Sequence, residues 1–118
     1  MNLLNKIENT LAKYKAHKEL IKNIEVKKSQ ESYPEQYDIF CYNIYTGFIH
    51  LRYGKVSINF SPAGAKDYTS TVLYSAKIGP SSMNEFSSEK ERCKIINKAK
   101  NLISECIYFD MLLQSTTH

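Results

Sequence analysis

The sequence lacks any long apolar run: none of its 118 residues lies in a stretch approaching the roughly 20 apolar residues that span a bilayer. The first residues, MNLLNKIENTLAKYK, mix polar and apolar side chains at helical spacing, so they lack the apolar core of a signal peptide. We therefore expect a cytoplasmic protein with no membrane partner.

Cysteine is scarce and widely spaced, with three residues at positions 41, 93 and 106. An odd number at these spacings provides neither a disulfide framework nor a CxxC zinc site. The pattern favours thiols that are buried as small apolar groups in a reducing compartment. We predict no metal site and no cofactor.

Catalytic motifs are also missing, because the chain contains no P-loop, no GxGxxG and no HExxH. Asp38, His50 and Ser57 supply the residue types of a nucleophilic triad, but Asp38 falls on the core-facing phase of its predicted strand. The segment 61–69, SPAGAKDYT, is typical of an ordinary loop and only weakly resembles a phosphate-binding one. The sequence predicts a binding protein without catalytic residues, and not an enzyme.

Charge and hydropathy describe one globular domain covering residues 1–118. The mean hydropathy is −0.43. There are 16 basic against 12 acidic residues, a net charge of +4. This mildly basic balance permits a nucleic-acid or phosphate partner, and it argues against an acidic mimic of DNA.

Two segments have helical periodicity. Residues 1–28 place apolar side chains at three- and four-residue steps until Lys18 interrupts the stripe, which favours packing on the domain over a long coiled coil. Residues 88–113 open with a capping box formed by Ser88 and Glu91. Their apolar stripe (95, 99, 102, 106, 109, 113) is widened by 96, 103, 107 and 111. This width predicts burial by the sheet on one side and by another subunit on the other, and hence a homo-oligomer.

Between the helices the apolar period is two, which predicts strands at 37–45, 48–53, 56–61 and 70–78. Turns at Thr46-Gly47 and Gly54-Lys55 pair apolar residues with apolar residues across the strands. The predicted fold is α+β: an N-terminal helix, a four-stranded antiparallel meander over 37–78 and a long C-terminal helix, with both helices on one sheet face.

The opposite face of the predicted meander is poor in lysine although the chain is rich in it. Arg52 lies mid-strand there, where its planar fork suits a phosphate or carboxylate. Such a face is typical of an interface core or ligand floor, or it is a solvated face of small polar side chains. The candidate binding residues on it are Asn43, His50, Arg52, Ser57, Asn59 and Lys77, beside Ile39, Cys41 and Leu73.

The segment YPEQYDIF…TGFIHLRYGKVSINF resembles a run in small phage and prophage proteins of low-GC bacteria. In these proteins a proline-glutamate-glutamine-tyrosine-aspartate stretch precedes a G-x-hydrophobic-x-leucine-arginine hairpin. The likeness covers about a quarter of the chain. The helix–meander–helix order is similar to Thoeris anti-defence proteins, which sequester a cyclic nucleotide-derived signal inside an oligomer. The resemblance implies that Arg52, Arg92 and a ring such as Phe86 would hold the phosphates and the base.

Two functional hypotheses follow. The first is a phage counter-defence protein in the host cytoplasm, which sequesters a phosphorylated nucleotide signal or blocks a host defence protein. The alternative is a dimeric protein that binds single-stranded nucleic acid by stacking bases on its rings. The predicted register weighs against the alternative, because it buries Phe40, Tyr42, Tyr53 and Phe60. A structural role in a virion has no sequence signature for or against it.

Overall fold

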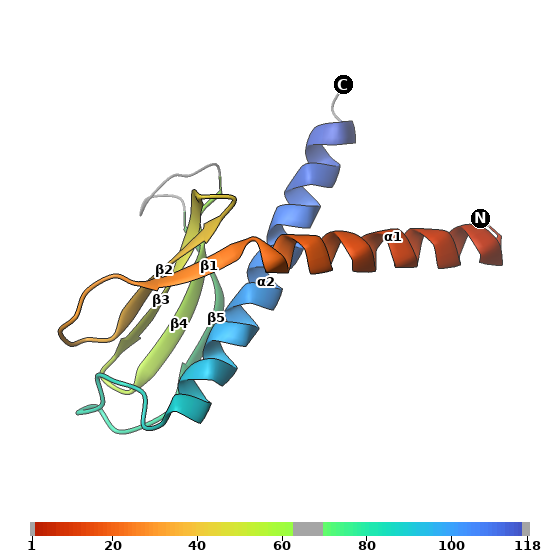
Figure 1. Cartoon of the computed structure of the whole chain (residues 1–118). Helices are drawn as coiled ribbons and strands as arrows, with labels where there is room; N and C mark the ends of the chain where they lie inside the picture. The colour runs from red at the N-terminus through yellow and green to blue at the C-terminus, as the bar shows by residue number, and fades with distance from the viewer. Residues whose placement is uncertain (1, 63–69, 117–118) are drawn as a thin grey trace.

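The computed structural model describes residues 2–62 and 70–116 and has an α+β fold (Figure 1). Helix α1 (Leu3–Lys22) precedes one antiparallel sheet, and helix α2 (Glu89–Thr116) follows it. The sheet has five strands in sequence order, not the predicted four. They are β1 (Ile24–Lys28), β2 (Gln36–Cys41), β3 (Ile44–Arg52), β4 (Lys55–Phe60) and β5 (Thr71–Lys77).

The additional strand lies within the predicted N-terminal helix, which was expected to run to residue 28. Helix α1 ends instead at Lys22, where the amide of Asn23 donates to the carbonyl of Leu20 at 3.0 Å. Two β-branched residues, Ile24 and Val26, then alternate with charged ones, a pattern that suits a half-buried strand. The strand β1 consequently pairs with β2 at the edge of the sheet.

The β3–β4 turn is Tyr53-Gly54, and the predicted turn at Gly54-Lys55 is wrong. Both central residues have positive φ, 54° and 76°, as in a type I′ turn. Leu51 therefore pairs with Val56, not with Ile58. Because the register moves by two residues, each side chain of β3 and β4 stays on its predicted face.

The β2–β3 turn is Tyr42-Asn43, again with positive φ at both residues, whereas Thr46-Gly47 lies inside β3. A bulge between Ile39 and Phe40 makes Thr46 the extra residue. Glycine is required at position 47, since a Cβ there would overlap the carbonyl oxygen of Asn59.

The bulge at Thr46 exchanges the two faces of β2. Ile39 and Cys41 are buried in the core, and Phe40 lies on the opposite face, the reverse of the prediction. A second bulge, at Ile58/Asn59, places Val72 of β5 opposite Asn59. Val72 is 60% exposed and does not belong to the core, which corrects its predicted position.

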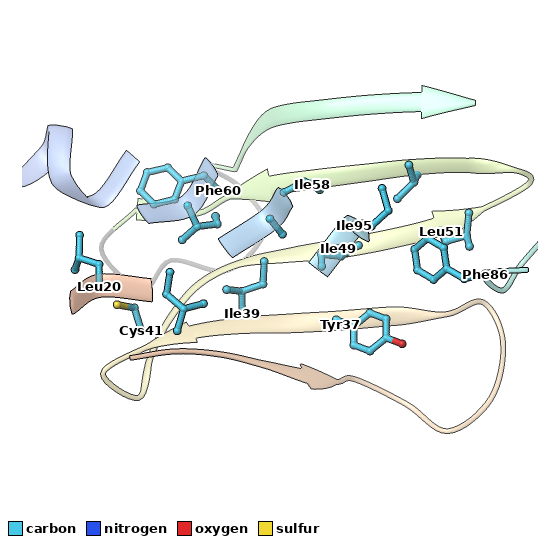
Figure 2. Packing of buried hydrophobic residues seen from close by; sticks show 14 residues of the cluster. Leu20, Tyr37, Ile39, Cys41, Ile49, Leu51, Ile58, Phe60, Phe86 and Ile95 are labelled. Atoms are coloured by element: carbon cyan, nitrogen blue, oxygen red, sulfur yellow. The ribbon is translucent and has the colours of Figure 1, made fainter. Parts of the chain in front are cut away.

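One face of the sheet and the first half of α2 form the core (Figure 2). Ile39, Ile49, Leu51 and Ile58 have no exposed surface. Removing so much apolar area from water is the main force that holds α2 on the sheet. From α2 the core takes Ile95, Ala99 and Ile103.

At the start of α2, one of the two predicted capping-box hydrogen bonds forms and the other does not. The amide of Glu91 donates to Ser88 Oγ at 3.1 Å, which confirms the cap. The Glu91 carboxylate accepts from the amide of Ser87, at 3.2 Å, and not from Ser88. The three cysteines are free, but only Cys41 is buried, while Cys93 is exposed.

Helix α1 packs across α2 and not onto the sheet. Leu20, in its last turns, belongs to the core. His17 Nδ1 is 3.1 Å from Ser104 Oγ of α2, and its ring centroid lies 5.2 Å from that of Tyr108. The rest of α1 extends away from the domain (Figure 1). None of the described helices is long and apolar enough to cross a membrane.

Candidate functional site

Neither described helix lies over the sheet face opposite α2, which is called here the open face (Figure 1). Strand alternation and the two bulges decide which side chains it carries. These are Glu25 and Lys27 on β1; Gln36, Asp38 and Phe40 on β2; Tyr45, Phe48, His50 and Arg52 on β3; Lys55, Ser57 and Asn59 on β4; and Val72, Ser75 and Lys77 on β5.

Three cations form a row across neighbouring strands at one end of the open face. Arg52 lies opposite Lys55, and Lys55 lies opposite Lys77. Like charges directly opposite each other destabilise a sheet. None of the three forms an ion pair within the part of the chain that the structure describes. The row therefore lacks a protein counter-charge there and is suited to an anion.

Arg52 itself is held beside an aromatic ring. Its guanidinium carbon lies 5.0 Å from the centroid of Tyr53, the first residue of the turn, so the planar group has a cation–π neighbour. Its nitrogens keep their donors for an incoming acceptor, because a ring face takes none of them. This is the geometry in which arginine and lysine differ most.

Small polar groups fill the middle of the open face. His50 lies opposite Ser57 on β4 and opposite Gln36 on β2. Asn59 Nδ2 donates to Ser57 Oγ at 3.1 Å. Burial lowers the pKa of His50, and the charge of Arg52 lowers it further. The imidazole is thus neutral at pH 7 and offers one donor and one acceptor.

Aromatic rings lie at the other end of the open face. Phe40 and Tyr45 pack edge to face with centroids 5.9 Å apart, and Lys27 Nζ is 5.4 Å from the Phe40 centroid. Phe48, two residues from His50 along β3, lies opposite Asn59. All three rings are partly exposed. Their π-faces can stack against planar groups.

The sequence prediction missed Phe40 and Tyr45 on this face, because it placed the β2–β3 turn four residues too late and did not include the bulge at Thr46. The signal that could have located the turn is Asn43. Asparagine tolerates positive φ far better than threonine does. A turn at 42–43 pairs Phe40 with Tyr45, and the bulge at Thr46 then brings both rings to the side of His50.

The predicted site residues do not all meet. His50, Arg52, Ser57, Asn59 and Lys77 share the open face. Asn43 lies in the β2–β3 turn, at the end of the sheet. Arg92 lies on the α2 side. The segment 61–69, which was expected to be an ordinary loop, lies mostly outside the described residues.

Arg92 is bound by a buried carboxylate. Its Nε and Nη2 donate to the two oxygens of Glu35 at 2.6 and 3.1 Å, and its Nη1 donates to Glu89. The hydroxyl of Tyr37 and the amide of Phe86, at 3.0 Å, also donate to Glu35. The cluster joins the start of α2 to β2, which is a structural use of Arg92.

In this cluster, hydrogen bonds to the Glu35 carboxylate compensate for the cost of burying its charge. Burial raises the pKa of Glu35, but the hydrogen bonds from Arg92, Tyr37 and the Phe86 amide outweigh it and bring the pKa below the ordinary 4.5. The hydrogen bond from Arg92 to Glu35 correspondingly raises the pKa of the guanidinium. Phe86, implied by the resemblance as a base-holding ring, is only 4% exposed.

The main hollows of the described surface are not lined by the three cations of the row. One of these hollows, about 930 Å³, is bounded by α1, α2 and the ends of β4 and β5. Another, about 650 Å³, lies between α1, α2 and the β2–β3 turn. Small ligands usually bind in pockets that bury most of their surface. The open face instead has the shape for an extended ligand.

Within the described residues, no group of three or more histidine, cysteine, aspartate or glutamate side chains could hold a metal ion. Comparisons with protein-family models, with curated proteins and with solved structures found no match to this chain.

Proposed function

We propose that this chain is a non-catalytic protein that binds single-stranded nucleic acid on its open face. One observation supports this most strongly: a row of cations without protein counter-charge lies on the same uncovered face as three partly exposed rings. Cations neutralise phosphates, and rings stack on bases of any sequence. Sequence-tolerant binders of single strands combine these two elements.

The spacing of the two elements favours a polymer. Phe48 lies four residues from Arg52 on β3, a separation of roughly 13 Å at about 3.3 Å per residue. One phosphate cannot occupy both ends of the face, whereas a strand that crosses it can. The partly exposed Ser57 hydroxyl and His50 imidazole between them can bond to bases or sugars without adding net charge.

Sequestration of a phosphorylated nucleotide signal, and with it a counter-defence role, is the alternative hypothesis. The same cations would bind its phosphates. The open face is broad and lies outside the main hollows, which weighs against tight enclosure of a small ligand. Arg92, one of the two arginines that this hypothesis used, is bound by Glu35.

The test is a salt titration with a labelled, unstructured oligonucleotide of about 12 nucleotides, a size within the range of single-strand sites. Three phosphate contacts predict that log K falls against log salt with a slope of about −2. Arg52→Ala, Lys55→Ala and Lys77→Ala should each reduce the slope by about 0.7. Lys90→Ala is the matched control, because Lys90 is exposed at the start of α2.

Two competitors separate the hypotheses. A duplex of the same sequence should compete poorly, since paired bases cannot stack on the rings. Displacement of the oligonucleotide by an equimolar nucleoside triphosphate would support sequestration instead. Absence of oligonucleotide binding at low salt would contradict the proposed function.

A further inference from the structure

Two helical arms extend beyond the sheet (Figure 1). The α1 arm is residues 3–16, and the α2 arm is residues 105–114. Both carry large apolar side chains with between 47% and 73% of their surface exposed. On the α1 arm these are Leu3, Leu4, Ile7, Leu11 and Tyr14, and on the α2 arm they include Phe109 and Met111.

The core covers only part of the arms: Cys106, Ile107 and Tyr108 of the α2 arm pack against it, while the exposed side chains named above do not belong to it. The apolar side chains in the first half of α2 pack in the core, where Ala99 and Ile103 have no exposed surface. The oligomer interface expected along all of 88–113 is therefore restricted to the α2 arm. On the α1 arm, Leu4, Ile7, Leu11 and Tyr14 follow three-four spacing, the seam by which one helix packs on another.

We propose that these arms bind a second copy of the chain, with the α1 arm of each copy packed along the α2 arm of the other. Charge decides this pairing. The α1 arm has three lysines against one glutamate. The α2 arm has Glu105 and Asp110 and no basic residue. Pairing α1 with α2 attracts, whereas pairing either arm with its own copy repels.

The available area suits a dimer. Seven large side chains that each expose about half of a surface on the order of 200 Å² offer roughly 700 Å² per copy. A standard interface buries about 800 Å² per partner. The hollows of about 930 and 650 Å³ flank the α2 arm and receive side chains from both helices. They provide space in which the partner's α1 arm can lie.

The interface is isologous, because each copy contributes one α1 arm and one α2 arm. Two equivalent contacts form at once, so the loss of either arm breaks both contacts in a homodimer. The open face lies on the other side of the sheet from α2 and is left uncovered. The inference is thus independent of the proposed nucleic-acid function.

The experiment is sedimentation equilibrium of the full chain without nucleic acid, from low to high micromolar concentration. The wild type should reach about twice the monomer mass of 13.6 kDa. Ile7→Asp/Leu11→Asp disrupts the α1 arm, and Phe109→Asp/Met111→Asp disrupts the α2 arm. Each should raise the dissociation constant at least about 100-fold, because a carboxylate is costly to bury unpaired. Circular dichroism should stay unchanged, since all four side chains are exposed in the monomer.

A mixture of the two double variants tests the pairing itself. The intact α1 arm of one variant meets the intact α2 arm of the other, so a heterodimer with one contact should form. Its dissociation constant should lie at least about tenfold below that of either variant alone. Val72→Asp, at an exposed apolar residue of β5, is the matched control and should leave the dimer intact.

Several results would overturn the proposal. These are a wild type that stays monomeric throughout, an α2-arm variant that still dimerises, or a mixture that recovers no association. Flotation of monomeric wild type with anionic vesicles would show that the arms bind lipid instead. If an aspartate variant unfolds, Lys6→Glu/Lys15→Glu replaces it. Its dimerisation should weaken at low salt and recover at high salt. A dissociation constant unchanged from that of the wild type would count against the pairing.

Discussion

The two faces of the sheet are built from the same strands and differ in almost every property. On the covered face, Ile49, Leu51 and Ile58 have no exposed surface. Their immediate neighbours along the chain, His50, Arg52 and Ser57, lie on the open face. One face excludes water and holds α2, while the other presents cations, polar groups and rings to solvent.

This difference separates stability from binding at the level of single residues. Alternation along a strand sends adjacent side chains to opposite faces. A substitution on the covered face should therefore change the free energy of unfolding, and one on the open face should change affinity. Each prediction below tests one side of that separation.

The largest effect is expected at Glu35, on the covered side. Glu35→Ala leaves Arg92 and the Tyr37 hydroxyl without their buried partner, so unfolding should become easier by about 3–5 kcal/mol. Urea denaturation measures this. Glu25→Ala is the control: its carboxylate pairs with Lys27 at 3.4 Å in an exposed position, and the loss should stay under about 1 kcal/mol. Equal losses would mean that the cluster does not hold α2.

The same carboxyl predicts a dependence of stability on pH. Its folded-state pKa is lowered from 4.5, so its contribution is present above that value. As the pH falls through the lowered pKa, the unfolded chain takes up more protons and stability is lost. Glu35→Gln should make the acid limb of a stability–pH curve shallower than in the wild type. A limb unchanged in slope would assign acid unfolding to other groups.

Truncation in the centre of the core comes next. Leu51→Ala and Ile58→Ala should each cost about 2–5 kcal/mol of unfolding free energy. Ser57→Ala, one residue from Ile58 and on the open face, should cost under about 1 kcal/mol. Thermal melting compares all three. A larger loss at Ser57 than at either core residue would exchange the two faces.

Much of this arrangement could be predicted from the sequence, for identifiable reasons. Strands β3 and β4 keep their predicted faces because a register error of two residues does not invert a strand. The Ser88 cap correctly starts α2. His50, Arg52 and Ser57 therefore lie on the face that was predicted for them. Their role in binding stays a prediction.

The failures also have physical causes. Strand β1 was assigned to the first helix, because Asn23 was not identified as its end. Bulges at Thr46 and between Ile58 and Asn59 change the side-chain phase without any composition signal. Because the bulge at Thr46 was not predicted, Phe40 was placed on the wrong face. Arg92 and Glu35 are 57 positions apart in the sequence, and no local pattern indicates their contact.

On the open face, Arg52 should have the largest effect on affinity. Arg52→Ala should weaken oligonucleotide binding by about 1.5–3 kcal/mol, the scale of a charged hydrogen bond, and leave the melting temperature nearly unchanged. Arg52→Lys should also weaken binding, because lysine lacks the planar fork. Fluorescence anisotropy at fixed ionic strength measures both. Full affinity of Arg52→Lys combined with a loss of stability in Arg52→Ala would mean that Arg52 serves only packing.

The smallest effect is expected at His50. Its pKa is lowered from 6.5 by burial and by Arg52, so protonation below that value adds a cation to the face. Oligonucleotide binding should tighten by up to about 1 kcal/mol as the pH falls below 6.5, while stability decreases slightly over the same range. His50→Gln should abolish the tightening, as affinity measured against pH would show. Persistence of the same profile in the variant would exclude His50 as its source.

An NMR titration with a single-stranded oligonucleotide tests the two-face account most directly. Resonances of Arg52 Nε and of the Phe40 and Phe48 rings should shift with increasing oligonucleotide. Amides of Cys93 and Asn97, which are exposed on α2, should remain in place. Shifts confined to α1 or α2, with the open-face resonances unchanged, would contradict the assignment of nucleic-acid binding to the open face.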